Sequence, residues 1–242
     1  MLDALWNSAT FATGLFQPDE LVALPEPARR YLQHALAPGA RLASAVRLRM
    51  QGQIKLGRWL PFRAEQVIHA ERGFIWAATV PLFGIPFIRG FDRFLDGSGE
   101  MRWKLLNRMP VMTASGPDVT RAASGRFDIE CFWLPSLLVR PGIEWTATDA
   151  DHAVATLALG HEPVTFEIGD NGRPHSVRMR RWGNPAGGPF ELLDFGGLLE
   201  SEATFDGYTI PNRVRAGWYF GTPRFESEGE FFRATIEAAT FR

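Results

Sequence analysis

Hydrophobic and polar residues alternate along most of this chain. In residues 43–56, ASAVRLRMQGQIKL, the apolar Val46, Leu48 and Met50 are separated by single polar residues. A period of two places successive side chains on opposite faces of a strand, so this segment predicts a strand with one buried face. The same kind of pattern recurs in further segments, which are 61–70, 73–80, 88–106, 142–149, 152–160, 162–182, 199–220 and 228–241.

Short turn sequences separate or interrupt these segments. Residues 96–99 are Asp-Gly-Ser-Gly, residues 170–172 are Asp-Asn-Gly, and residues 206–207 are Asp-Gly. Asn-Gly and Asp-Gly pairs between alternating runs are strong hairpin signals. Closely spaced strands with such turns predict an antiparallel meander rather than βαβ units.

The period changes to that of a helix in two places. Residues 18–36 predict a helix in two pieces, interrupted by Pro25 and Pro27. Residues 118–138 predict a second, central helix, which Asp118 starts and which stops before Pro135. Arg121, Ser124 and Asp128 fall on its polar side.

These elements predict a mainly β (α+β) fold. The expected architecture is a curved antiparallel sheet, or open half-barrel, with an N-terminal helix and one central covering helix. We expect a single domain over residues 1–242, made of a helical segment (1–40), strands (43–113), the covering helix (118–138) and further strands (143–242).

The central helix places two charged residues inside its own apolar face. Arg126 and Glu130 are four residues apart and can pair with one another. They can form a structural ion pair that fixes the helix on the sheet. Alternatively, the helix covers a cavity, and the pair contacts the polar end of a ligand. Gly125, beside them, predicts a close approach to a strand or a local kink.

Aromatic residues are abundant, with 19 Phe and 8 Trp. In an antiparallel sheet this supply predicts a thick core or a wide apolar cavity. We expect Trp76, Trp103, Trp133 and Trp218 to form cavity walls.

Two arginines alternate with phenylalanines in residues 87–94, FIRGFDRF. Arg89 and Arg93 share one face of this strand, which fits the rim of a cavity, where an arginine can pair or stack. An exposed arginine whose stem covers apolar neighbours gives the same pattern. Glu200 and Glu202 likewise fit either paired-carboxylate chemistry or a solvated strand face.

Charge and motif content exclude several classes of function. The net charge is −1 and no run of Lys or Arg exceeds two residues, which argues against nucleic-acid binding. No apolar stretch approaches the roughly 20 residues of a transmembrane helix. We also expect no metal or cofactor, because Cys131 is the only cysteine, the five histidines show no ligand spacing, and no phosphate-binding loop occurs. The first 20 residues lack a basic segment followed by an apolar one, which predicts a cytoplasmic protein.

Several motifs together resemble a bacterial family that is known only as a domain of unknown function. They are LPEPARRYLQHAL, AVRLRMQGQI followed by RWLPFRAEQV, GFIW, GSGEMRWKLL, GPDVTRAASGR and GYTIPNRVRAGWYF. More distantly, the order of elements and the GYTIP hairpin resemble the periplasmic lipoprotein carriers. That resemblance implies an open antiparallel half-barrel with an apolar concave face under helices. We do not expect the carriers' export signal here, because residues 1–20 show no such pattern.

Three functions fit these patterns. The first is binding of an apolar or amphiphilic small molecule between the sheet and the helix. The second is a cofactor-independent lyase, isomerase or cyclase that uses Glu130 as the acid or base and Arg126 as its partner. The third is a structural or partner-binding module that uses its aromatic surface to form an oligomer. For ligand binding, the candidate residues are Trp76, Arg89, Arg93, Trp103, Arg126, Glu130, Trp133 and Trp218.

Overall fold

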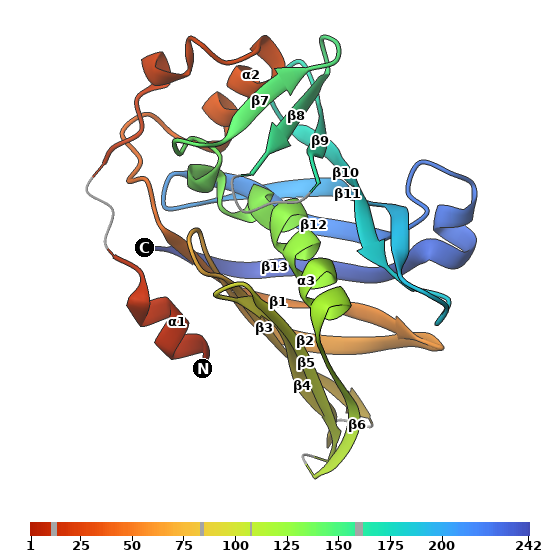
Figure 1. Cartoon of the computed structure of the whole chain (residues 1–242). Coiled ribbons are helices and arrows are strands. Elements are labelled where there is room, and N and C mark those ends of the chain that lie inside the picture. Colours follow the sequence, from red (N-terminus) through yellow and green to blue (C-terminus); the bar gives the residue numbers. More distant parts are fainter. Residues whose placement is uncertain (11–13, 83–84, 107, 158–161) are drawn as a thin grey trace.

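A computed structural model describes residues 1–10, 14–82, 85–106, 108–157 and 162–242. Within these residues, thirteen strands form one antiparallel sheet in the order β6-β5-β4-β3-β2-β1-β13-β12-β11-β10-β9-β8-β7 (Figure 1). The strands of the first half are β1 (Ala45–Leu56), β2 (Arg58–His69), β3 (Gly73–Leu82), β4 (Ile85–Leu95), β5 (Ser98–Leu105) and β6 (Met109–Ser115). Those of the second half are β7 (Glu144–Ala147), β8 (His152–Thr156), β9 (Val164–Ile168), β10 (Pro174–Gly183), β11 (Glu191–Phe205), β12 (Tyr208–Trp218) and β13 (Glu230–Phe241).

Every pair of neighbouring strands is consecutive in sequence except the central pair, β1 and β13. The register there runs from Val46 opposite Phe241 to Ile54 opposite Phe232. The sheet is therefore two meanders joined at their starting and finishing strands. Since β6 and β7 lie at opposite edges and do not pair, the sheet stays an open half-barrel, as the sequence predicts.

This topology explains the position of the central helix. The chain has to travel from the edge at β6 to the edge at β7, and it does so across the concave face of the sheet as α3 (Pro117–Ile129) (Figure 1). On this route α3 packs against β10 on one side and against β5 and β4 on the other. The predicted covering helix thus spans the two halves of the sheet.

The α-helix is shorter than predicted. It ends at Ile129, and the residues after it form the 3-10 turns η2 (Glu130–Trp133) and η3 (Pro135–Leu137). Proline disfavours the α conformation in the residue before it, and Leu134 has φ −130° and ψ 69°. Ser124 and Asp128, expected on the polar side, are 1% and 0% exposed. That expectation was wrong because α3 is covered on several sides.

The N-terminal helices cover other surfaces of the sheet. The predicted two-piece helix is observed as the 3-10 turn η1 (Pro18–Leu21) and α2 (Glu26–Ala35). A further helix, α1 (Leu2–Ser8), precedes it within the predicted helical segment 1–40. Leu5 of α1 packs with Val67 and Ile75 on the convex face. A further π-turn, η4 (Phe225–Gly229), precedes β13.

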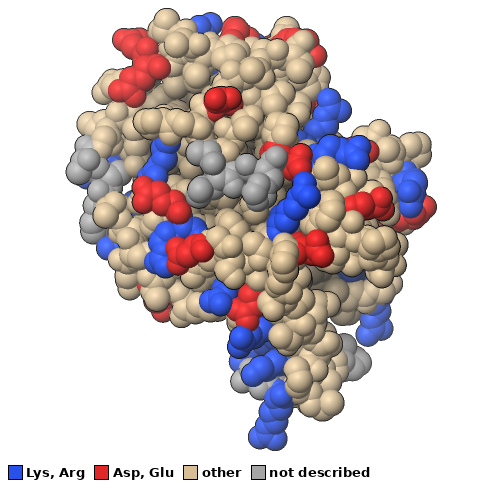
Figure 2. Space-filling view, viewed as in Figure 1, with Lys and Arg blue, Asp and Glu red and all other residues tan. Residues whose placement is uncertain are grey.

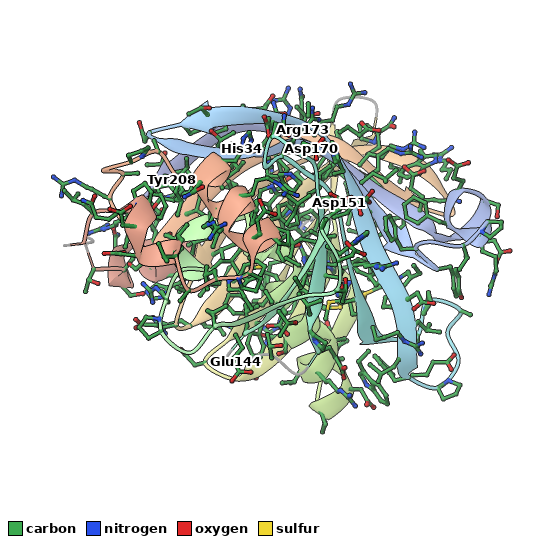
Figure 3. All side chains as sticks on the ribbon, turned by 90° about the horizontal axis from the view of Figure 1, so that it is seen from above. His34, Glu144, Asp151, Asp170, Arg173 and Tyr208 are labelled. Atoms are coloured by element: carbon green, nitrogen blue, oxygen red, sulfur yellow. The ribbon has the colours of Figure 1, made fainter. Side chains whose placement is uncertain are left out.

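Helix α2 docks on the β9–β10 turn. Figure 3 shows His34 near Asp170 and Arg173, where this turn meets α2. Gly172 lies so close to α2 that a Cβ atom would come within 2.4 Å of the Arg30 carbonyl oxygen, and its φ is +83°. Only glycine combines that backbone conformation with that approach.

The main core lies on the concave face, under α3 and the turns after it. Its largest fully buried side chains include Trp76, Trp133, Phe74 and Phe127. On the opposite side of the molecule from α2, strands β4–β6 extend as an arm, and Figure 2 shows Lys and Arg side chains gathered over its lower end. Residues 158–160 of the predicted strand segment 152–160 lie outside the described residues.

Candidate functional site

A cavity of about 350 Å³ lies between α3 and the concave face of the sheet. Both halves of the sheet contribute to it, because α3 crosses the midline. Most of its lining is aromatic or aliphatic, and these residues include Phe74, Trp76, Val119, Ile129, Phe132, Trp133, Val177, Phe195, Leu199, Val214, Trp218, Phe231 and Phe232. The cavity is therefore mainly apolar, and only a few of its lining residues are charged.

One wall of this cavity carries a cluster of charges centred on Arg126. Its Nε donates to Glu130 Oε1 at 2.7 Å, and its Nη1 donates to Asp92 Oδ2 at 3.1 Å. Gln66 on β2 donates from Nε2 to the other oxygen of Glu130 at 2.5 Å. The guanidinium also lies over the rings of Phe74 and Trp76, 4.8 and 5.0 Å from their centroids. Two carboxylates and two aromatic faces thus surround one arginine.

These side chains are enclosed by the protein and yet remain accessible from the cavity. The accessible fractions of the Asp92, Arg126 and Glu130 side chains are 18%, 16% and 13%. Burial raises the pKa of Asp92, while the charge of Arg126 and the 2.8 Å hydrogen bond from Trp103 Nε1 oppose that rise. The cluster therefore combines structural pairing with a polar surface that a bound molecule can touch.

Arg181, near the end of β10, is a further arginine of the cavity. Its Nε and Nη2 both donate to the carbonyl oxygen of Ala122 on α3, at 3.3 and 3.2 Å. The guanidinium packs on the rings of Phe195 and Trp218, 4.5 and 5.3 Å from their centroids. Burial, followed by repulsion from Arg126, lowers the pKa of Arg181 to about 10. It still carries its charge at neutral pH.

The structure brings six of the eight predicted site residues to the cavity lining, and the side chains of five of them lie on the inward face. These five are Trp76, Arg126, Glu130, Trp133 and Trp218. Trp103 stands directly behind them: it packs on Trp76 with 5.7 Å between ring centroids and donates its hydrogen bond to Asp92.

Arg89 and Arg93 point to the convex face. Arg93 is the register partner of Ile75, which packs under α1, and its guanidinium pairs with Glu100 at 2.6 Å. Arg89 is opposite Thr79 on that same face. Alternation along β4 therefore gives the concave face to Asp92, opposite Trp76, and turns both arginine side chains toward the other face. Arg93 is still among the residues that line the cavity, and Arg89 is not.

Sequence reasoning missed Asp92, Arg181 and Gln66. Each interrupts an inward-facing apolar row: Asp92 precedes Phe94 by two positions, and Arg181 follows Val177 and Met179 at the same spacing. A polar residue at an inward position was the available signal. For Arg181 it was obscured by the neighbouring Arg178 and Arg180, which are exposed.

The described residues form neither the paired-carboxylate site that Glu200 and Glu202 could have made nor a metal site. Glu200 pairs with Arg213 at 3.1 Å and Glu202 contacts His34 at 2.9 Å, so each carboxylate has its own partner. Among the described residues, no three His, Cys, Asp or Glu side chains are grouped to hold a metal ion. In that same part of the chain, no helix has the length and apolar character needed to cross a membrane.

One protein family includes most of this chain. A family model described as a family of unknown function, DUF6544, matches residues 14–227. The chain belongs to the DUF6544 family. The membership in a family of unknown function that its motifs predict is therefore confirmed. A search of curated proteins gave no match to this DUF6544 chain.

Solved structures share the fold of this DUF6544 protein at low sequence identity. A DUF1329 family protein from Desulfovibrio piger is 11% identical, with a TM-score of 0.50, over 89% of this chain and 90% of its own. A LolA superfamily protein from Nitrosomonas europaea is 11% identical, with a TM-score of 0.49 over 89% and 92%. A putative outer membrane lipoprotein-sorting protein domain from Vibrio parahaemolyticus is 9% identical, with a TM-score of 0.44 over 82% and 86%. At such identities the likeness concerns the fold alone.

Proposed function

We propose that this DUF6544 protein binds an apolar or amphiphilic small molecule in the cavity between α3 and the sheet. The observation that carries the proposal is the cavity of about 350 Å³, with aromatic walls and one partly accessible charged cluster. Ligand pockets typically measure about 300–1,000 Å³ and combine apolar walls with a few convergent polar groups.

Native mass spectrometry tests this proposal directly. The protein is purified from cells without detergent, and its mass is compared before and after organic extraction. We expect a small hydrophobic molecule to leave on extraction. A neutral environment-sensitive dye, N-phenyl-1-naphthylamine, should then bind the extracted protein with increased fluorescence.

A cavity-filling variant provides the matched comparison. Ala123 lines the cavity from α3, so Ala123→Phe should reduce dye binding at least tenfold by occupying its volume. Ala147→Phe makes the same change at an exposed position on edge strand β7 and should bind the dye as the wild type does. Dye binding that is equal in both variants, with no molecule released on extraction, contradicts the proposal.

A second function has support from one feature of the same cavity. Burial raises the pKa of Asp92, and a carboxyl group with a raised pKa can move a proton in an apolar site. Glu130, the catalytic candidate from sequence, lies on the other side of Arg126. A cofactor-independent lyase or isomerase is therefore the alternative. Mass spectrometry of the extracted molecule, after incubation with fresh wild-type or Asp92→Asn protein, would reveal turnover as a product that only the wild type forms.

A further inference from the structure

Arg181 has hydrogen-bonding capacity that its protein contacts do not use. A guanidinium carries five N–H donors. Two nitrogens of Arg181 share the single carbonyl oxygen of Ala122, at 3.3 and 3.2 Å. Asp92 and Glu130, the carboxylates whose charges act on Arg181, are paired with Arg126 instead. A partly enclosed cation therefore faces the cavity with free donors.

Arg126 provides the contrast inside the same cavity. Its Nε and Nη1 are bound to Glu130 and Asp92, and its planar face covers two rings. Both carboxylates are held against Arg126, so that arginine has little capacity left for a ligand. Arg93, the third arginine of the lining, is paired with Glu100 at 2.6 Å. Arg181 is therefore the cavity arginine that can take a new acceptor.

The surroundings of Arg181 favour an acidic acceptor. Phe195 and Trp218 flank the guanidinium, which leaves its edge, where the N–H groups point, as the route for a partner. A carboxylate matches the planar fork of donors along such an edge, and the bond is stronger in an apolar site than in water. Asp92 and Glu130 repel a further anion, but Arg126 offsets part of their charge.

We infer that the ligand is an amphiphile with a single carboxylate head group, which Arg181 binds, and with an apolar tail that occupies the aromatic part of the cavity. This inference rests on the proposed binding function and adds the chemical class of the head group. It assigns Arg181 as the residue that distinguishes acids from neutral or basic amphiphiles. A neutral head group would satisfy the donors less well, and an amine would be repelled.

Displacement of N-phenyl-1-naphthylamine from extracted protein by three probes of equal chain length tests the inference. The probes are dodecanoic acid, 1-dodecanol and dodecylamine, each below its aggregation concentration at pH 7.5. We expect the acid to bind at least tenfold more tightly than the alcohol, and the amine to bind most weakly. Arg181→Met should remove the preference for the acid while leaving affinity for the alcohol within about threefold.

Arg180→Met is the matched control, because Arg180 is the adjacent residue on the opposite face of β10 and its side chain is 60% exposed. It should keep the preference for the acid. Arg181→Lys retains the charge without the planar fork, and we expect an intermediate preference, which can be read even if Arg181→Met does not fold.

Two results overturn the inference and leave the binding function standing. They are equal affinity of the wild type for acid and alcohol, and an unchanged preference for the acid in both Arg181 variants. If neither the dye nor any of the three probes binds to the wild type, the proposed function itself fails, and the inference fails with it.

Discussion

Arg126 is the residue on which the charged cluster depends. It compensates two carboxylates, so a change at Arg126 strands both of them, whereas a change at Glu130 leaves Arg126 paired with Asp92 at 3.1 Å. Breaking an enclosed ion pair from one side typically costs about 3–5 kcal/mol, because a buried charge is left without its partner.

We therefore expect Arg126→Met to destabilise the protein by about 3 kcal/mol and Glu130→Gln by about 1 kcal/mol. Urea unfolding at pH 7 measures both. The triple change Arg126→Met, Asp92→Leu and Glu130→Met should recover much of the loss, since apolar groups of similar size often replace an ion cluster without cost. Equal losses in the two single variants would contradict this account of the cluster.

Glu230 at the start of β13 is the second enclosed carboxylate with unusual electrostatics. Arg215 binds it through two nitrogens, each at 2.8 Å, and Arg233 adds contacts at 2.6 and 3.1 Å. The hydrogen bonds from Arg215, followed by those from Arg233, hold the pKa of Glu230 at about 2.

A depressed pKa in the folded state stabilises the protein at pH values above the pKa in the unfolded chain, which is about 4.3. That stabilisation decreases as the pH falls from about 4.3 to about 2. Its full value is near 3 kcal/mol, and screening near the surface reduces it to about 2 kcal/mol.

Glu230→Gln should therefore be less stable than the wild type at pH 7 and should lose less stability than the wild type between pH 4.5 and 2.5. Thermal unfolding across that range measures the difference. The exposed Glu237→Gln, on the same strand, serves as control. If the stability of Glu230→Gln depends on pH as that of the wild type does, the pairing of Glu230 with the two arginines does not stabilise the protein in this way.

At the scale of elements, the contact between α3 and β10 holds Arg181 in place. Gly125 of α3 lies over the arginine stem: a Cβ atom there would be 3.3 Å from Arg181 Cγ and 3.5 Å from Met179 Cε. The sequence left a close approach or a kink open at Gly125, and the close approach is what the structure contains.

This contact predicts two different outcomes at one position. Gly125→Ala gains helix propensity of up to about 1 kcal/mol and needs only a small shift of a flexible side chain, so stability should change little. Gly125→Leu should displace Arg181 and weaken binding of dodecanoic acid, while binding of 1-dodecanol changes less. Circular dichroism verifies the helix in each variant. If Gly125→Leu keeps the wild-type preference for the acid, the contact between residue 125 and Arg181 does not control acid binding.

The elements also differ in how far the sequence determines them. Alternation and the turn at Asp206-Gly207 predicted hairpins such as β11–β12, because strand period and turn chemistry are local. The end of α3 at Ile129 and the burial of Asp128 depend on what packs around the helix, which no local pattern contains. Arg89 was misplaced because its strand is mixed on both faces, so alternation alone did not say which face is concave.

At the scale of the whole molecule, both meanders are needed to form the cavity. Trp76 comes from the first and Trp218 from the second, and α3 connects the edges across them. Parts that are distant in sequence have to be in place together before the cavity exists, so its residues show no compact sequence motif. This is why the aromatic walls could be predicted as a class, whereas the signal for Asp92 and Arg181 was only a polar residue within an inward-facing apolar row.

The central pairing of β1 with β13 has a consequence for how the protein is made. Strand β1 (Ala45–Leu56) leaves the ribosome well before β13 (Glu230–Phe241), so one of its two edges has no partner until eleven further strands have been made. An unpaired strand edge invites pairing with other chains, so the nascent protein carries this hazard through most of its synthesis. We expect ribosome-bound chains that end at Gly229 to be digested rapidly by protease, and chains in which Arg242 has cleared the exit tunnel to become resistant. If the shorter chains are equally resistant, the free edge of β1 is protected in some other way before β13 is made.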